Sequence, residues 1–382
     1  MRNSTQTLAQ LNFIAFFYFI ANFVASAIHY FFQLRAAQVL TDHQYGEFSV
    51  WLSGVSLVLS LSIFAQNIGN FLPLSIAKSR AVIWFATSLC ALLFIAIIYN
   101  NITSDFLLGF LAIIFAIPFA WFVGQLQVRH MFLSMSFLLV LVAIVKFGAT
   151  WMPALEPLRN FYLALPVSFL GGLLACSILL FFPVSNFLYT EQNRDSITKR
   201  LLASFLLAIF ALGVPNIDTL WVGQTQQAYD VAVFAKIILV CKAVFFSLMI
   251  FANWILPKQI SGKSIFKLNK KRLWQFFCLC FIAASGVYLT MPWIFLHIFS
   301  INLGIHQDWL FVSTFNISLM AGLYLLAQGD CAQLRMRRPL IWFVLYVCIY
   351  FIAKFTGLNV MQYLLLSGLF HSLLLIYWFR RT

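Results

Sequence analysis

The sequence contains very few charged side chains: Asp, Glu, Lys and Arg together make up 9% of its 382 residues. In soluble domains about a quarter of the residues are charged. Hydrophobic residues instead reach 63%, and the mean hydropathy is +0.94. This composition excludes a soluble globular domain. It predicts an all-α, polytopic membrane protein, because a helix satisfies its own backbone polar groups in lipid.

The sequence also lacks the motifs of common catalytic and cofactor sites. It has no paired carboxylates and no HExxH, Walker A, GxGxxG or GxSxG element. Its seven cysteines form neither a CxxC motif nor a Cys/His cluster. We therefore expect no catalytic residues, metal or cofactor. A membrane-embedded polysaccharide polymerase or ligase is the enzymatic alternative, but such enzymes present acid, base or Arg residues on a sizeable outer loop, and the outer connections here are short.

Apolar segments separated by charges, proline and glycine are long enough for about twelve membrane crossings, since one crossing needs about 20 residues. The predicted spans are residues 10–33, 46–70, 80–99, 106–128, 131–151, 161–183, 200–222, 230–256, 273–299, 307–328, 339–356 and 359–379. The connection between the last two is very short. Eleven crossings, or a re-entrant final segment, is therefore the alternative.

Basic residues alternate between the connections, which predicts the orientation of the chain. Loops that contain Lys and Arg stay in the cytoplasm, and one alternate set of connections holds most of these residues. Its members are Arg2, Lys78, Arg80, Arg129, Arg194, Lys199, Arg200, Lys258, Lys263, Lys267, Lys270, Lys271, Arg272, Arg335, Arg337, Arg338, Arg380 and Arg381. The opposite set has only Arg35 and Arg159. Both termini are therefore expected in the cytoplasm. Contact with anionic membrane lipid accounts for the net charge of +14, and no nucleic-acid partner is expected.

Polar residues recur at fixed offsets between the two halves of the chain. The matches are Tyr45 with Tyr229 and Pro73 with Pro257 at an offset of 184, and residues 125–129 with 333–337 and 146–147 with 354–355 at an offset of 208. These offsets align units of six helices, which keeps the orientation of the unit unchanged. The repeat predicts an N-terminal bundle over residues 1–190 and a C-terminal bundle over residues 191–382, enclosing a central cavity suited to alternating access.

Short motifs resemble one family of membrane proteins. Residues 35–49, RAAQVLTDHQYGEFS, are similar to the first outer loop of the Wzx-type polysaccharide flippases, which belong to the multidrug/oligosaccharidyl-lipid/polysaccharide exporter superfamily. The sequence Asn216-Ile217-Asp218, followed by Tyr229 and Pro257, and the basic connection around Arg129 also carry the resemblance. Helix number and topology agree with the family over the whole chain, although the chain is short for the family and its second half carries a longer basic loop.

The resemblance implies a flippase of the bacterial cytoplasmic (inner) membrane. Such a protein moves undecaprenyl-diphosphate-linked oligosaccharide units to the outer leaflet for O-antigen, lipopolysaccharide or other surface polysaccharide biosynthesis. The implied partners are this lipid-linked oligosaccharide, membrane lipid and a coupling ion, either a proton or sodium. A drug or metabolite exporter of the same superfamily is the other alternative, and it would be expected to carry acidic residues in its cavity.

Five ionisable residues fall inside the predicted spans: Lys146, Asp218, Lys236, Lys242 and Lys354. Each charge at the membrane centre costs about 2.5–3.5 kcal/mol on insertion scales. Four lysines against one aspartate predict a positive interior, which would attract a diphosphate and repel cationic drugs.

Individual roles follow from position. Lys146 and Lys354 occupy equivalent places in the repeat, where they either line the cavity or extend to the outer headgroups. Lys242 lies deeper and is a candidate substrate-binding cation. Lys236 could reach Asp218 across a helical hairpin, either as a static ion pair or as an ion-coupling site. Arg35 either guards the outer mouth of the cavity or anchors its helix at the interface.

Overall fold

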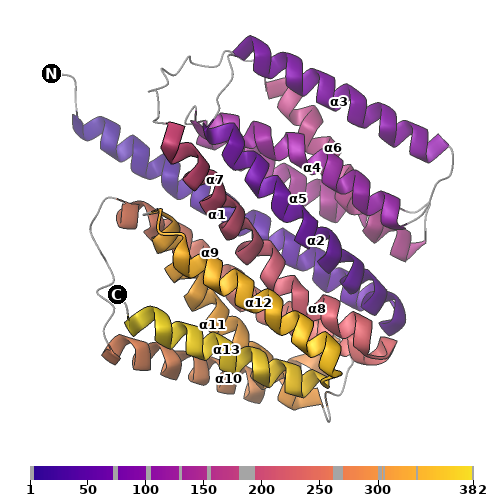
Figure 1. The fold of residues 1–382 in the computed structure, drawn as a ribbon. Coiled ribbons are helices and arrows are strands. Elements are labelled where there is room, and N and C mark those ends of the chain that lie inside the picture. The colour runs from indigo at the N-terminus through magenta and orange to yellow at the C-terminus, as the bar shows by residue number, and fades with distance from the viewer. Residues whose placement is uncertain are drawn as a thin grey trace. The chain divides into compact units, whose positions relative to one another are not determined.

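The computed structural model describes residues 4–71, 76–99, 105–128, 131–152, 156–179, 194–260, 270–299, 303, 306–332 and 334–380. All regular elements in these residues are helices (Figure 1). The first six are α1 (Ser4–Val39), α2 (Asp42–Phe71), α3 (Ile76–Tyr99), α4 (Asp105–Val128), α5 (Phe132–Ala149) and α6 (Pro157–Leu179). They are followed by α7 (Arg194–Ala208), the π-helical turn η1 (Ile209–Gly213), α8 (Val214–Thr225), α9 (Ala228–Ile260), α10 (Lys270–Ile298), α11 (Gln307–Ala332), α12 (Arg337–Thr356) and α13 (Val360–Arg380).

The predicted all-α membrane architecture is confirmed. Each predicted span overlaps a helix, and residues 200–222 correspond to α7, η1 and α8 together. The end of one predicted span, residues 180–183, lies outside the described residues. Eight described helices are long and apolar enough to cross a membrane, or nine when α7 and α8 count as one bent span. The chain is therefore a multi-pass membrane protein. Twelve crossings with both termini in the cytoplasm stay a prediction.

Local sequence determines several helix ends. Thr41 and Gln44 bond reciprocally at the start of α2: Thr41 N donates to Gln44 Oε1 at 3.2 Å, and Gln44 N donates to Thr41 Oγ1 at 3.4 Å. Asn359 and Gln362 form the same arrangement before α13. Such a capping box satisfies two backbone N–H groups that have no partner within the helix. α12 ends at Gly357, whose φ of 65° is left-handed and therefore favours glycine.

Contacts divide the chain into two compact units. The first comprises Met1–Gln33 and Val58–Leu201, and the second comprises Leu34–Leu57 and Leu202–Thr382. The boundaries at residues 33/34 and 57/58 fall inside α1 and α2. The contacts thus assign residues 34–57 differently from the predicted division into 1–190 and 191–382. An internal duplication, on which that division rested, stays a prediction.

In the first unit, α6 packs against α3, α4 and α5. Gly172 allows the close approach of these helices, because a Cβ there would lie 2.8 Å from side-chain atoms of both Phe119 and Val142. Buried polar groups pair across the same unit. Thr87 and Ser177 hydroxyls lie 3.0 Å apart. A polar contact also joins α4 to α2, where Gln125 Nε2 donates to the carbonyl of Gly69 at 2.8 Å.

In the second unit, α11 is the central helix. It packs against α9, α10, α12 and α13, and 72% of its most apolar stretch is buried, the largest share among the described spans. Asn316 ties α11 to α13 by donating from Nδ2 to the carbonyl of Leu364 at 2.7 Å. Gly368 makes room for this amide, since a Cβ there would lie 2.3 Å from Asn316 Oδ1.

Residues 34–57, which we call the hairpin tip, contain the end of α1 and the first half of α2. The tip packs along α8 through small residues. A Cβ on Gly223 would lie 2.3 Å from Val50 Cγ2, and one on Gly213 would lie 2.9 Å from Leu57 Cδ1. The tip thereby contacts η1 and the last turns of α8, and the glycines permit the short distance between the helices.

Candidate functional site

The candidate site is built on a break in a membrane-spanning helix. α7 and α8 together are long and apolar enough to cross a membrane, but they are bent by 49° at the π-helical turn η1. Pro215 explains the break, because proline has no N–H to donate to the carbonyl four residues earlier and its ring clashes with that turn. Interrupted helices with π-turns are found frequently at functional sites. The residues that follow the break are therefore candidates for a functional site.

Asp218 lies one turn beyond the break and is buried, with 3% of its surface exposed. Its Oδ1 accepts a hydrogen bond from the Tyr346 hydroxyl at 2.9 Å and another from the Tyr363 hydroxyl at 2.5 Å. These tyrosines belong to α12 and α13. One carboxylate oxygen thus joins three helices of the second unit.

Lys242 approaches the same place from α9. Its Nζ donates to Asn216 Oδ1 at 2.6 Å, and Asn216 is one of the residues at the start of α8. Lys242 and Asp218 attract one another electrostatically. We refer to Asn216, Asp218, Lys242, Tyr346 and Tyr363 as the polar cluster. It contains one formal negative and one formal positive charge among apolar helices.

Aromatic rings hold the two tyrosines in position. Trp221 stacks on Tyr363 with ring centroids 4.4 Å apart, and His371 stacks on Tyr346 at 5.6 Å. All four side chains are buried. This packing favours the ring positions in which both hydroxyl groups bond Asp218.

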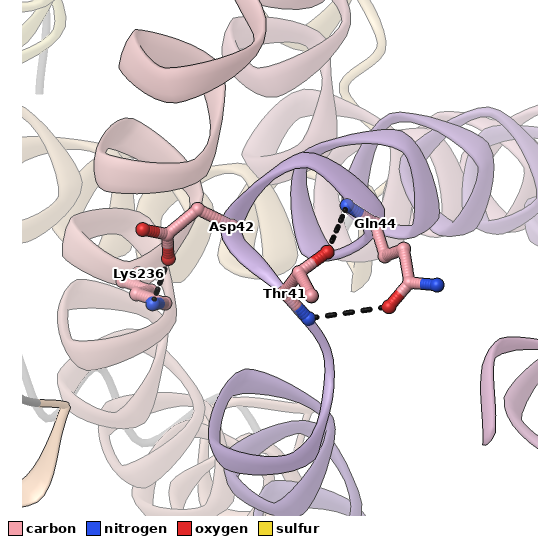
Figure 2. A network of polar contacts seen from close by, with 4 residues as sticks. All are labelled: Thr41, Asp42, Gln44 and Lys236. Carbon is pink, nitrogen blue, oxygen red and sulfur yellow. Dashed lines mark hydrogen bonds and ion pairs between the residues drawn. The ribbon is translucent and has the colours of Figure 1, made fainter.

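The predicted ion pair between Asp218 and Lys236 is not formed. Lys236 Nζ instead lies 2.8 Å from Asp42 Oδ1 (Figure 2). Lys236 and Lys242 are six residues apart on α9 and so project in different directions. The position of Lys236 near the outer end of its helix led us to expect Asp218 as its partner. Its side chain instead projects toward the hairpin tip.

The Lys236–Asp42 pair fixes the hairpin tip to α9. Figure 2 shows Asp42 directed at Lys236 from the first turn of α2, while Thr41 and Gln44 bond each other beside it. The Lys236 ammonium also lies 5.6 Å from the centroid of the Tyr45 ring and 6.0 Å from that of Phe299. These ring faces favour a cation. Lys236 therefore has a structural partner and is not available for the polar cluster.

Lys146 and Lys354 occupy matching positions but different surroundings. Each lies in the last turn of its helix, α5 or α12, where a cation interacts favourably with the helix dipole. Lys146 is partly buried, with Nζ 4.2 Å from the centroid of the Phe32 ring, and it has no ion pair with any described carboxylate. Lys354 is exposed beside the exposed Phe355. Their lining of a cavity stays a prediction.

Arg35 lies near the end of α1 and is partly buried within the hairpin tip. Its Nε is buried without a hydrogen bond. The contacts thus assign Arg35 to the second unit, although the earlier part of α1 belongs to the first. Its two proposed roles, at the mouth of a cavity or at the interface, stay open.

The sequence reasoning missed Tyr346, Tyr363 and the Asp42 partner of Lys236. Tyrosines are common in membrane helices, so neither was distinguishable from other aromatic residues before the helices were packed. Asp42 did belong to the quoted outer-loop motif, and its place directly after an N-cap threonine was a usable signal.

Comparison with protein-family models, curated proteins and solved structures finds no match to this chain.

Proposed function

We propose that this protein is a membrane transporter of the flippase class. The observation that carries the proposal is the polar cluster at the broken span, where Asp218 and Lys242 are held inside the second unit. Secondary transporters place substrate and ion sites at interrupted helices. Ionisable residues inside membrane helices are costly and mark ion or substrate pathways. A protein whose helices served only as a scaffold would not need them.

The charge distribution supports an anionic cargo. Lys236 is neutralised by Asp42, but Lys146 has no carboxylate partner among the described residues. In the polar cluster Lys242 balances the charge of Asp218, so the site offers a drug-like cation little attraction. A diphosphate group carries the complementary charge.

The resemblance to polysaccharide flippases makes the cargo specific. We propose an undecaprenyl-diphosphate-linked oligosaccharide, moved by alternating access from the inner to the outer leaflet of a bacterial inner membrane. In this proposal two helical bundles enclose a cavity, the protein makes no covalent bond to its cargo, and a proton or sodium ion supplies the driving force.

Reconstitution tests the proposal directly. Purified protein in liposomes should accelerate the movement of a fluorescent undecaprenyl-diphosphate oligosaccharide between leaflets, measured by chemical quenching of the outer leaflet. Lys242→Gln and Asp218→Asn should slow it by at least tenfold while the protein remains folded. Lys199→Gln, which removes an exposed charge of α7, should have no effect.

Other results would reject the flippase. No acceleration in any lipid composition would exclude this cargo. Appearance of a longer glycan chain would indicate a polymerase, and export of organic cations would indicate a drug exporter.

A further inference from the structure

A groove lies between α10, α11 and the first turn of α13, three helices that pack together within the second unit (Figure 1). Its volume is about 430 Å³, which is within the range of small-molecule sites. Tyr288, Leu289 and Phe311 give it aromatic and apolar walls, and Ser285 and Asp308 add polar groups. The groove contains no member of the polar cluster and is therefore a separate site.

The groove is open, and one of its walls is the helix with the most exposed apolar surface. Only 18% of the most apolar stretch of α10 is buried, the smallest share among the described spans. Leu289, which lines the groove, is 76% exposed. In a membrane-spanning helix such a surface meets lipid chains, which are as apolar as leucine. An occupant can thus enter the groove from the membrane.

Asp308 gives the groove a negative charge that the surrounding helices do not balance. It is exposed in the first turn of α11 and makes no ion pair with any residue that the structure describes. The sequence has no Lys or Arg between residues 273 and 334, which leaves α11 and all but the first turn of α10 without a cation. In α13 the single Lys or Arg is Arg380, at the end opposite the groove.

Aromatic rings next to this carboxylate add to the attraction for a cation. Phe311 follows Asp308 by three residues, so the two share one face of α11. The ring of Tyr288 lies perpendicular to that of Phe311, with the centroids 6.0 Å apart. Gln307 Nε2 donates to the carbonyl of Tyr288 at 3.5 Å, which brings this part of α10 to the start of α11. Ring faces attract ammonium groups.

We propose that the groove binds a membrane lipid with a primary-ammonium headgroup, its ammonium on Asp308 and an acyl chain along the apolar walls. Asp308 lies at the end of a span, at the level of the headgroups, and Phe311 lies one turn further into the span. A primary ammonium donates N–H hydrogen bonds to a carboxylate, which are stronger than neutral ones, whereas a choline group has no N–H to donate. The inference does not depend on the proposed function.

Photocrosslinking in nanodiscs tests the site on the full-length protein. The probes are phosphatidylethanolamine and phosphatidylcholine with the same photoactivatable acyl chain, and mass spectrometry locates the labelled peptides. In the wild type the ethanolamine lipid should label residues 285–289 and 308–312 about tenfold more than the choline lipid, the ratio expected for one hydrogen bond to a charged group. This comparison needs no variant.

Variants then test the carboxylate and the groove separately. Asp308→Asn should reduce labelling by the ethanolamine lipid to the level of the choline lipid, and Asp308→Glu should retain most of it. Asp105→Asn removes an acid from the first turn of α4, in the other unit, and should have no effect. Ser285→Phe keeps Asp308 but fills the groove, so it should abolish labelling by both lipids.

Several results would overturn the inference. Equal labelling by the two lipids in the wild type, or unchanged labelling of Asp308→Asn, would show that the groove does not select the headgroup. Loss of labelling when an equimolar amount of soluble phosphoethanolamine is added would assign the groove to a water-soluble amine. Loss with equimolar tetraphenylphosphonium, which has no N–H, would assign it to lipophilic cations.

Discussion

Lys236 and Asp42 form an ion pair at 2.8 Å whose two members are unequally buried: the lysine side chain is 3% exposed and the aspartate 42%. Water can solvate Asp42 when its partner is removed. It cannot solvate Lys236 in the same way. Replacing Asp42 and replacing Lys236 should therefore lower the free energy of unfolding by different amounts, although both changes remove the same ion pair.

Asp42→Asn should destabilise the protein more than Lys236→Met. The first change leaves a buried charge without compensation, which costs about 3–5 kcal/mol. The second leaves a half-exposed carboxylate and an apolar side chain of similar length, and should cost about 1 kcal/mol or less. Thermal unfolding in one detergent measures both, and the double variant should resemble Lys236→Met. Equal losses of thermal stability in the two single variants would show that the unequal burial of the two side chains does not determine the cost of removing either one.

Tyr346→Phe and Tyr363→Phe should each remove one hydrogen bond to Asp218. In membrane proteins such a bond contributes about 0.6–2 kcal/mol. The double variant should lose more than the sum, because Asp218 would then have no donor on Oδ1. Tyr350→Phe is the matched control, since its hydroxyl bonds Gln224 at an exposed position on the same helix. An additive double variant would argue against a shared network.

Gly223→Ala should weaken the packing of the hairpin tip on α8. The new Cβ would lie 2.3 Å from Val50 Cγ2, and overpacking of this kind costs about 1–3 kcal/mol. Val50→Ala should restore the loss by removing the clashing atoms. Gly286→Ala in α10 meets nothing within 4 Å and should stabilise its helix by up to about 1 kcal/mol. Similar effects of the two alanines on thermal unfolding would contradict this packing.

A reporter fused after Thr382 should be active only in the cytoplasm, and one inserted near Glu156 only outside. The reason is the concentration of Lys and Arg in alternate connections, which retains those loops on the cytoplasmic side. Paired reporters that are active on opposite sides of the membrane measure both positions. An external C-terminus would require an odd number of crossings.

Helix positions were predictable because hydrophobic length is a property of the chain itself. Every predicted range overlaps a helix in the described part of the chain, and Pro215 inside one of them explains its division into α7 and α8. Ionisable residues inside the helical spans were also predictable, as Asp218 and Lys242 stand out in apolar sequence. The residues that contact them were not predictable, because these depend on the orientation of each helix about its own axis in the packed structure. Asp218 is therefore hydrogen-bonded by tyrosines of α12 and α13 and not paired with Lys236, as we had expected.

The assignment of residues 34–57 to the second unit has a consequence for synthesis of the protein. Their partners, α8 and Lys236, leave the ribosome only after all of α3 to α6. The first helical hairpin thus enters the membrane with Asp42 uncompensated and with the surface that packs on α8 still without its neighbour, and it completes its packing late. Such long-range pairing slows folding and leaves a nascent chain vulnerable. Two fragments divided between α6 and α7 should accordingly recognise each other when co-expressed, since the earlier one carries a segment whose place is in the later one.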